Sequence, residues 1–261
     1  MLVKDVVNAV EKLAPPELAE HWDNVGLLIG DEKKPCKRVL FALDAIDAVI
    51  DEAIEEKADM IVTHHPIIFK GVSSVNTKTA LGRRIIKLVK NDIAVYCAHT
   101  SLDIAAGGTN DILADTLKLK NKEGLIPLEN GFMGRTGSLD TPVSLREFTQ
   151  NVIETLGMPS VNVTGDENTV IKKIGLCTGS GADRDFMLAA KKAGCDVYIT
   201  GDVKYHDAQF ADDIGICLID ATHFYTETIA MPIVCDLVKN ETGLDCFVTK
   251  IKGESFKNIR G

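Results

Sequence analysis

Several features are scarce or missing in this chain of 261 residues, and each absence excludes a class of protein. No apolar run approaches the roughly 20 residues of a membrane-spanning helix, and the acidic, amphipathic N-terminus is unlike a secretory signal. The seven cysteines are scattered and form no CxxC pair, which argues against a disulfide framework or a cysteine-type zinc site. We therefore expect a cytoplasmic protein with buried, reduced thiols and no membrane partner.

Clusters of positive charge are also missing. The chain has 29 Lys and Arg against 38 Asp and Glu, a net charge of −9, and its basic stretch at 34–38 is short and isolated. Binding to the phosphates of nucleic acids depends on grouped cations, so we expect no nucleic-acid partner. The remaining composition, 45% apolar and 26% charged, is typical of a globular protein.

Helix and strand patterns alternate through the first 120 residues. Apolar residues at helical spacing predict a helix over 3–13. Further along, buried-strand patterns alternate with helical patterns at 38–44 (strand), 45–58 (helix), 59–63 (strand), 78–90 (helix) and 92–98 (strand). Such alternation implies crossover connections and a mainly parallel or mixed sheet.

The second part of the chain repeats this order. The stretch 37–65 aligns with 172–202, and 91–103 aligns with 212–227. We interpret the repeat as a duplication, although any two strand–helix–strand units share some similarity. The prediction is an α/β fold of two similar halves, with a metal site in the cleft between them.

The predicted division has three parts. They are a first α/β half over 1–120, a connecting segment over 121–160, and a second α/β half over 161–261 that completes the metal site. The connecting segment contains strand patterns and one helix, whose start fits a capping box of Ser144 and Glu147.

Polar side chains of metal-binding type follow three of the predicted strands. They are His64 and His65 after 59–63, His99 and Asp103 after 92–98, and His223 and Glu227 after the corresponding strand of the second half. Ligands gather beyond the carboxyl ends of parallel strands, so we expect these side chains to converge. Imidazole nitrogens and carboxylate oxygens together suit Zn, Mn, Fe or Ni.

The spacing of these residues favours two metal ions over one. His223 and Glu227 are four residues apart, so on a helix they share a face. His64 and His65 are adjacent and would point to opposite sides of extended backbone, so each could serve a different ion. A carboxylate can then bridge a pair of ions. The alternative is that each residue is an ordinary hydrogen-bonded side chain at a strand end.

Each of several other motifs has both a functional and a structural interpretation. The glycine-rich turns at 106–111 and 177–186 could cradle an anion or be plain turns, the first capped by Thr109 or Asn110. Lys204, Tyr205 and His206 could face the cleft and meet a negatively charged substrate, or could pack structurally. Trp22-Asp23-Asn24 is either a structural turn or a segment near the site.

Five stretches jointly resemble a known family: "WDNVGLLIG", "VTHHPIIF", "AHTSLDIAAGGTND", "TGDVKYHDA" and "LIDATHFYTE". They are similar to the NIF-three-like dinuclear metal proteins, the GTP cyclohydrolase I type II homologues, in the short form without an inserted middle domain. The resemblance implies two similar α/β halves and a homohexameric ring. It also implies that His65 and Asp103 hold one metal, that His64 and His223 hold the other, and that Glu227 bridges both.

The function expected from the ligands and the resemblance is that of a metal-dependent hydrolase. Two divalent transition-metal ions per chain (Zn, Fe, Mn or Ni) would supply metal-bound hydroxide to attack a nucleotide-like or phosphate-bearing small molecule. His99, also a candidate ligand or supporting residue, or His206 would move protons as a catalytic residue. The alternatives are a metal-dependent phosphoesterase and a non-enzymatic protein that binds or stores metal or interacts with a partner.

Overall fold

A computed structural model describes residues 1–257 and contains two α/β units, each built around its own sheet. Unit 1 comprises Met1–Ala105 and Ala230–Glu254, and unit 2 comprises Ala106–Ile229 with residues 255–257. All seven cysteines lie in the described part, buried and unbridged as expected.

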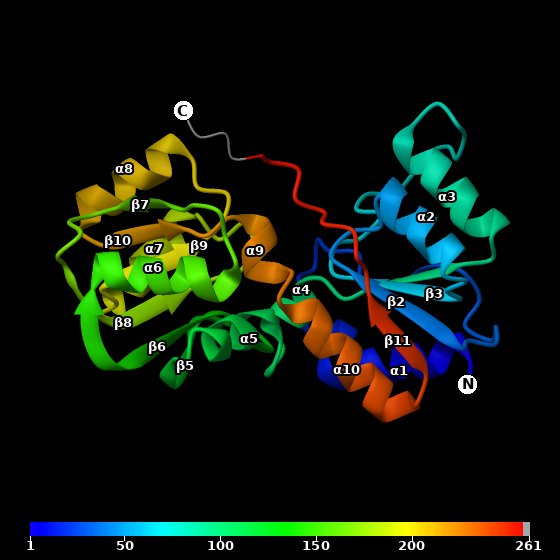
Figure 1. Ribbon diagram of the computed structural model, residues 1–261, viewed down its shortest axis with the longest axis horizontal. Coiled ribbons are helices and arrows are strands. Elements are labelled where there is room, and N and C mark those ends of the chain that lie inside the picture. The colour runs from blue at the N-terminus through cyan, green and yellow to red at the C-terminus, as the bar shows by residue number, and fades with distance from the viewer. Residues whose placement is uncertain (258–261) are drawn as a thin grey trace. The chain divides into compact units, whose positions relative to one another are not determined.

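Unit 1 contains a five-stranded sheet in the order β1-β4-β3-β2-β11, in which β1 alone is antiparallel to its neighbour. Its strands are β1 (Gly26–Ile29), β2 (Arg38–Ala42), β3 (Met60–Thr63), β4 (Ala94–Cys97) and β11 (Asp245–Val248). Its helices are α1 (Val3–Leu13), the 3-10 helix η1 (Pro16–Leu18), α2 (Asp47–Glu55), α3 (Ala80–Lys90), α4 (Thr100–Ile104) and α10 (Ala230–Thr242). In Figure 1, α2 and α3 cover one face of this sheet, and α1 and α10 cover the other.

Apolar side chains on both faces explain why these strands form a central layer. Leu40, Ile61 and Val95 pack with Val49 and Ile50 of α2 in one fully or nearly fully buried cluster. Each such side chain contributes about 1.5–3 kcal/mol when it leaves water. A strand buried on both sides reads as a continuous apolar run, and this is the pattern of "RVLFA" and "MIVT".

Unit 2 contains a six-stranded sheet in the order β5-β6-β8-β9-β10-β7. Its strands are β5 (Lys120–Leu128), β6 (Gly131–Ser144), β7 (Asn162–Thr164), β8 (Val170–Leu176), β9 (Val197–Thr200) and β10 (Cys217–Asp220). Its helices are α5 (Thr109–Thr116), α6 (Leu145–Leu156), α7 (Arg184–Lys192), α8 (Tyr205–Ile214) and α9 (His223–Glu227). Helices α5 and α6 pack on one face, and α7 and α8 pack on the other (Figure 1). The predicted capping box at Ser144 and Glu147 is present at the start of α6.

The two sheets share one topology, so the predicted α/β fold of two similar halves is confirmed. In unit 1 the order β1-β4-β3-β2 has a parallel core and an antiparallel edge strand that precedes it in the chain. In unit 2 the order β7-β10-β9-β8 repeats the same arrangement, again with the antiparallel edge strand first in the chain.

The contacts divide the chain at different points from the expected boundaries at 120 and 160. Helix α10 and strand β11 follow the second repeat in sequence, yet β11 pairs in parallel with β2 of unit 1 and α10 packs against β11 and α1. Helix α5 and strand β5 precede residue 130, yet they belong to unit 2. Unit 1 therefore includes elements that follow the second repeat in sequence, and unit 2 includes elements that directly follow the first repeat.

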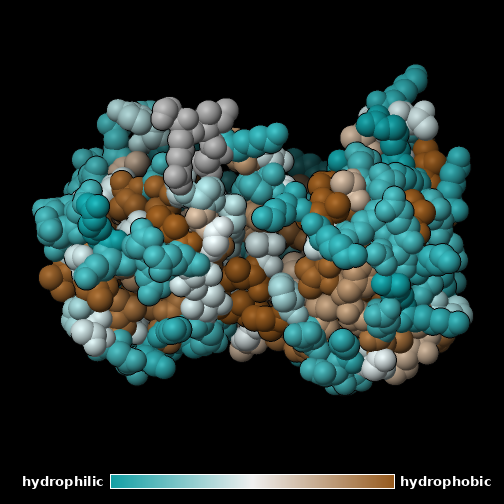
Figure 2. Space-filling view, in the orientation of Figure 1, coloured by the Kyte–Doolittle hydropathy of each residue, from teal (hydrophilic) through white to brown (hydrophobic). Residues whose placement is uncertain are grey.

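The surface is polar over much of the face seen in Figure 2, including the outer side of α3. Among residues 1–257, none of the helices combines the length and the apolar character needed to cross a bilayer.

Candidate metal centre

The histidine pair lies in a bend directly after β3, where the chain leaves the sheet. The backbone N–H groups of His64 and His65 donate to the end of β2 and to the residue after it, at 3.3 Å from Ala42 O and 2.9 Å from Leu43 O. Thr63 Oγ1 donates to His65 O at 2.8 Å, which closes the bend. The expectation that the two rings point to opposite sides is wrong, because it assumed extended backbone: their centroids lie 5.1 Å apart.

Each histidine of this cluster has its Nδ1 atom against an oxygen that can only accept a hydrogen bond. The distances are 3.0 Å from His64 to Ala98 O, 2.9 Å from His65 to Asp44 Oδ1, and 2.8 Å from His99 to Asp23 Oδ1. Nδ1 therefore donates, and in the neutral ring Nε2 keeps its lone pair. One ligand atom of each ring lies within 4.8 Å of the others, so the three histidines form a group that could hold a metal ion.

Asp23 fixes the position of His99 through several hydrogen bonds. Its side chain is fully buried and also accepts from Thr100, from N at 3.0 Å and from Oγ1 at 2.6 Å. Burial raises the pKa of Asp23, but the hydrogen bonds from His99 and Thr100 outweigh it and lower the pKa to about 2. Asp23 is thus a carboxylate at neutral pH and favours a protonated Nδ1 on His99.

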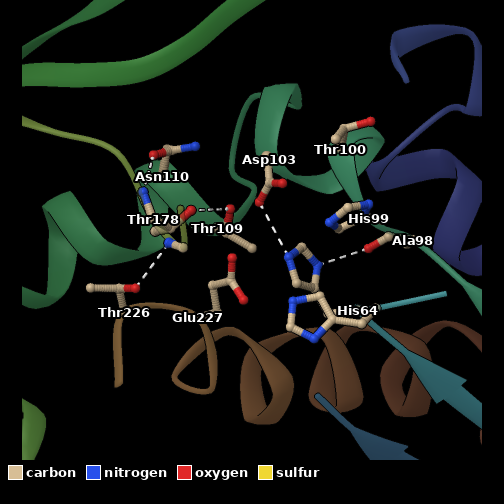
Figure 3. A network of polar contacts seen from close by, with 12 residues as sticks. His64, Ala98, His99, Thr100, Asp103, Thr109, Asn110, Thr178, Thr226 and Glu227 are labelled. Carbon is tan, nitrogen blue, oxygen red and sulfur yellow. Dashed lines mark hydrogen bonds and ion pairs between the residues drawn. The ribbon is translucent and has the colours of Figure 1, made fainter. Parts of the chain in front are cut away.

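A carboxylate joins this cluster from α4. Asp103 is 7% exposed, and its Oδ1 lies 3.5 Å from Nε2 of His64, which is fully buried (Figure 3). The structure thus brings Asp103 to His64, whereas the family resemblance implied His65 as its partner on a metal.

Unit 2 carries the second group of candidate ligands on α9. His223 and Glu227 share a face of this helix, as their spacing predicted, with His223 Nε2 at 3.0 Å from Glu227 Oε2. The Nδ1 atom of His223 lies 2.8 Å from Asp202 Oδ2, so a fourth imidazole has its Nε2 directed by an acceptor on the other nitrogen. Glu227 is 3% exposed.

The start of α9 is held in an unusual backbone conformation. Thr222, directly before the helix, has a φ of +56°, which a β-branched residue rarely adopts. Thr226 Oγ1 donates to Thr222 O at 2.9 Å and accepts from Gly179 N at 3.0 Å, which ties α9 to the turn after β8. A Cβ added at Gly201 would lie 2.4 Å from His223 N. Close packing thus positions the ligand-bearing helix.

The donor set fits a transition metal. Two ligand atoms bound at about 2.0–2.2 Å to one ion lie roughly 3–3.5 Å apart. The distances of 3.5 Å between His64 and Asp103 and of 3.0 Å between His223 and Glu227 fall in this range. Neutral imidazole with a carboxylate or carbonyl on its second nitrogen is also the usual arrangement of metal-binding histidines.

Comparisons with known proteins show the family of this chain. The model of the family described as Duf34/NIF3 (NGG1p interacting factor 3) matches residues 1–254. The chain belongs to the Duf34/NIF3 family. A Clostridium perfringens protein named GTP cyclohydrolase 1 type 2 homolog is 38% identical over 266 residues, which cover 99% of this chain and 100% of the relative.

Solved structures of the NIF3 group share the fold. A hypothetical protein of Staphylococcus aureus has a TM-score of 0.92 and 31% identity, with 99% of each chain covered. A Bacillus cereus protein related to NIF3 has a TM-score of 0.93 over 99% of each chain at 24% identity. The family resemblance expected from the motifs is thereby confirmed.

Other residues singled out in the sequence lie elsewhere in this NIF3 chain. His206 is on the exposed side of α8, with Nδ1 at 3.0 Å from Gln209 Oε1, and it is absent from the metal-type groups found in residues 1–257. Tyr205 is 73% exposed beside it, and Lys204 is the N-cap of α8. A role for His206 in proton transfer stays a prediction.

The glycine-rich turns are held together by their own side chains. Gly108 is the N-cap of α5, in place of the expected Thr109 or Asn110. Thr109 Oγ1 lies 3.1 Å from Thr178 Oγ1, and Asn110 Oδ1 accepts from Thr178 N at 3.0 Å (Figure 3). These contacts connect the turn at 106–111 with the turn at 177–186 inside unit 2.

The residues that support the histidines were not predicted from the sequence. Asp44 and Asp202 were not predicted to contact His65 and His223, although a signal existed for both, since each follows a strand at its carboxyl end. Gly179 was missed as well: a Cβ there would lie 2.0 Å from Glu227 Oε1. Its local sequence offers no sign of this contact.

Proposed function

We propose that this protein binds two divalent transition-metal ions per chain and is a metal-dependent hydrolase of nucleotide-like substrates. One observation carries the proposal: His64, His65 and His223 each have Nδ1 fixed by an acceptor, which directs three Nε2 lone pairs for coordination. A histidine without a bound metal does not require a hydrogen-bond acceptor at Nδ1, whereas metal-binding histidines almost always have one on the nitrogen that does not bind the metal.

The proposed ligands are the five residues expected from the sequence. His64 and Asp103 would share one ion, because they are 3.5 Å apart. His65 and His223 would serve the other, and Glu227, with two carboxylate oxygens and a 3.0 Å contact to His223, would bridge both.

The remaining residues of the site would orient ligands and move protons. When bound, a pair of such ions lowers the pKa of water and stabilises negative charge on a reacting oxygen. His99 is the proposed proton-transfer residue, because its ring lies beside those of His64 and His65 and Asp23 holds it in place through the Nδ1 hydrogen bond. Asp44 and Asp202 would hold the imidazoles of their histidines in place. His206 is the second candidate for proton transfer.

The nucleotide-like substrate is supported by the names of relatives as GTP cyclohydrolase 1 type 2 homologs. The test is a screen of metal-reconstituted protein against purine nucleotides and phosphoesters, with Glu227→Ala as the inactive control. Turnover of a nucleotide by the wild type alone supports the proposal. Metal binding without turnover of any of these compounds would contradict the hydrolase and favour the alternative of metal storage.

We also propose that the protein forms a homohexamer in the cytoplasm, as the family resemblance implies. Light scattering of the purified protein should give a mass close to six times 28.3 kDa. The mass of a monomer or dimer at micromolar concentration would contradict the ring.

A further inference from the structure

Two aromatic side chains of unit 1 are exposed and lie against each other. Trp22 is 51% exposed and Phe69 is 45% exposed. Their ring centroids are 5.9 Å apart, and the ring planes meet at 56°. Large aromatic rings gain free energy by leaving water, so a pair that remains half-exposed is suited to contact with a further molecule.

The pair lies directly beside a histidine of the candidate metal centre. The centroid of His99 is 6.2 Å from that of Trp22 and 6.4 Å from that of Phe69, with edge-on geometry at 77° and 75°. His99 itself lies 5.2 Å from His64 and 5.5 Å from His65, measured between ring centroids. A ligand ring on this pair would therefore be next to the proposed reaction site.

Hydrogen bonds fix the backbone on both sides of the pair. Asp23, the neighbour of Trp22, is tied to His99 at 2.8 Å and to Thr100 at 2.6 Å. Asn24 Nδ2 donates at 2.5 Å to the carbonyl of Ile68, the neighbour of Phe69. The same framework thus fixes His99 and the chain segments that carry both exposed rings, which limits the conformational freedom lost when a ligand binds.

We propose that Trp22 and Phe69 form a stacking platform for the planar heteroaromatic ring of the ligand. The inference rests on the proposed function in one respect: the part of the ligand outside the ring is taken to bind at the metal centre. Stacking is tolerant of ring identity, because every base has a π-face. The platform therefore selects for a flat ring as a class and leaves the choice among bases to other contacts.

The test uses Trp22 as the reporter, because it is the only tryptophan of the chain. Guanosine monophosphate, adenosine monophosphate and ribose 5-phosphate are titrated into full-length, metal-loaded protein while tryptophan fluorescence is recorded. We expect saturable quenching by the two nucleotides and none by ribose 5-phosphate. Quenching by all three, or by none, would overturn the platform.

Calorimetric titration of variants gives a second readout. Trp22→Phe retains a ring and should bind the nucleotides within about threefold of the wild type, whereas Trp22→Leu should bind about 10-fold or more weakly. Phe69→Leu should also weaken binding, and the matched control Phe132→Leu, at a phenylalanine 46% exposed in unit 2, should not. Equal affinity of Trp22→Phe and Trp22→Leu would contradict stacking.

Three further measurements separate this inference from the alternatives. Metal content is determined in every sample, so a protein that loads metal but shows no ring-dependent quenching refutes the platform and leaves the metal proposal standing. Nucleotide quenching that persists after chelation supports the platform without the metals. A change of oligomeric mass in Trp22→Leu, with nucleotide binding unchanged, would show that the pair contacts another copy of the chain and would overturn the proposal.

Discussion

Replacing Gly179 by alanine should remove metal from the site by displacing a ligand. Gly179 has a φ of +65°, and an added Cβ would lie 2.0 Å from Glu227 Oε1 and 3.0 Å from its carboxyl carbon. To reach an ordinary contact of 3.4 Å, the oxygen must move by about 1.4 Å. Metal–ligand distances tolerate only about 0.2 Å, and Glu227 is almost fully buried with little room to adjust. We therefore expect Gly179→Ala to lose metal.

A matched control separates the cost of placing alanine at a positive φ from the effect of the contact with Glu227. Alanine in the left-handed region costs about 1–2 kcal/mol, and Gly194 has a φ of +77° with no atom within 4 Å of an added Cβ. Without metal, Gly194→Ala should show the backbone cost alone and Gly179→Ala a larger loss of thermal stability, and elemental analysis should find metal loss in Gly179→Ala alone. If Gly179→Ala retains the wild-type metal content, the contact with Glu227 does not position a ligand.

Two further predictions concern carboxylates. Asp44→Ala and Asp202→Ala each remove an acceptor from a histidine Nδ1, and each should weaken metal binding about 10- to 100-fold in calorimetric titrations; unchanged affinity would contradict their role. Burial raises the pKa of Asp111, but hydrogen bonds from Arg135 and Gly107 outweigh it, so the pKa is lowered in the folded protein. The carboxylate therefore stabilises the fold above the unfolded pKa of about 4, and this contribution is lost as pH falls further. The difference in unfolding free energy between wild type and Asp111→Asn should shrink below about pH 4, and a constant difference would refute the pairing with Arg135.

Much of the fold follows from local pattern. Doubly buried strands such as "MIVT" are continuous apolar runs, and the helix over Val3–Leu13 has the boundaries that its apolar spacing predicted. The repeat was also visible in sequence, because both halves use the same order of elements. The exchange of α10 and β11 into unit 1 could not be predicted, since strand pairing between Cys246 and Val39 depends on contacts remote in sequence.

The candidate ligands of the site could be selected from sequence more readily than the residues that support them. Candidate ligands at strand ends are visible because histidine and carboxylate types coincide with the ends of apolar runs. The bend at His64 and His65 was not visible, because it depends on a hydrogen bond from Thr63 to a backbone carbonyl. Asp23 contacts His99 across 76 positions of sequence, a pairing that only the folded chain reveals.

The most direct test of the central claim is the metal content of the purified protein. Full-length protein is stripped with chelator, reloaded with Zn, Fe, Mn or Ni at neutral pH, desalted, and measured by elemental analysis beside Glu227→Ala. The proposed dinuclear site predicts close to two ions per wild-type chain and the loss of both in the variant. Fewer than one ion per chain with every metal would contradict the claim, and loss of a single ion in Glu227→Ala would refute the bridging role.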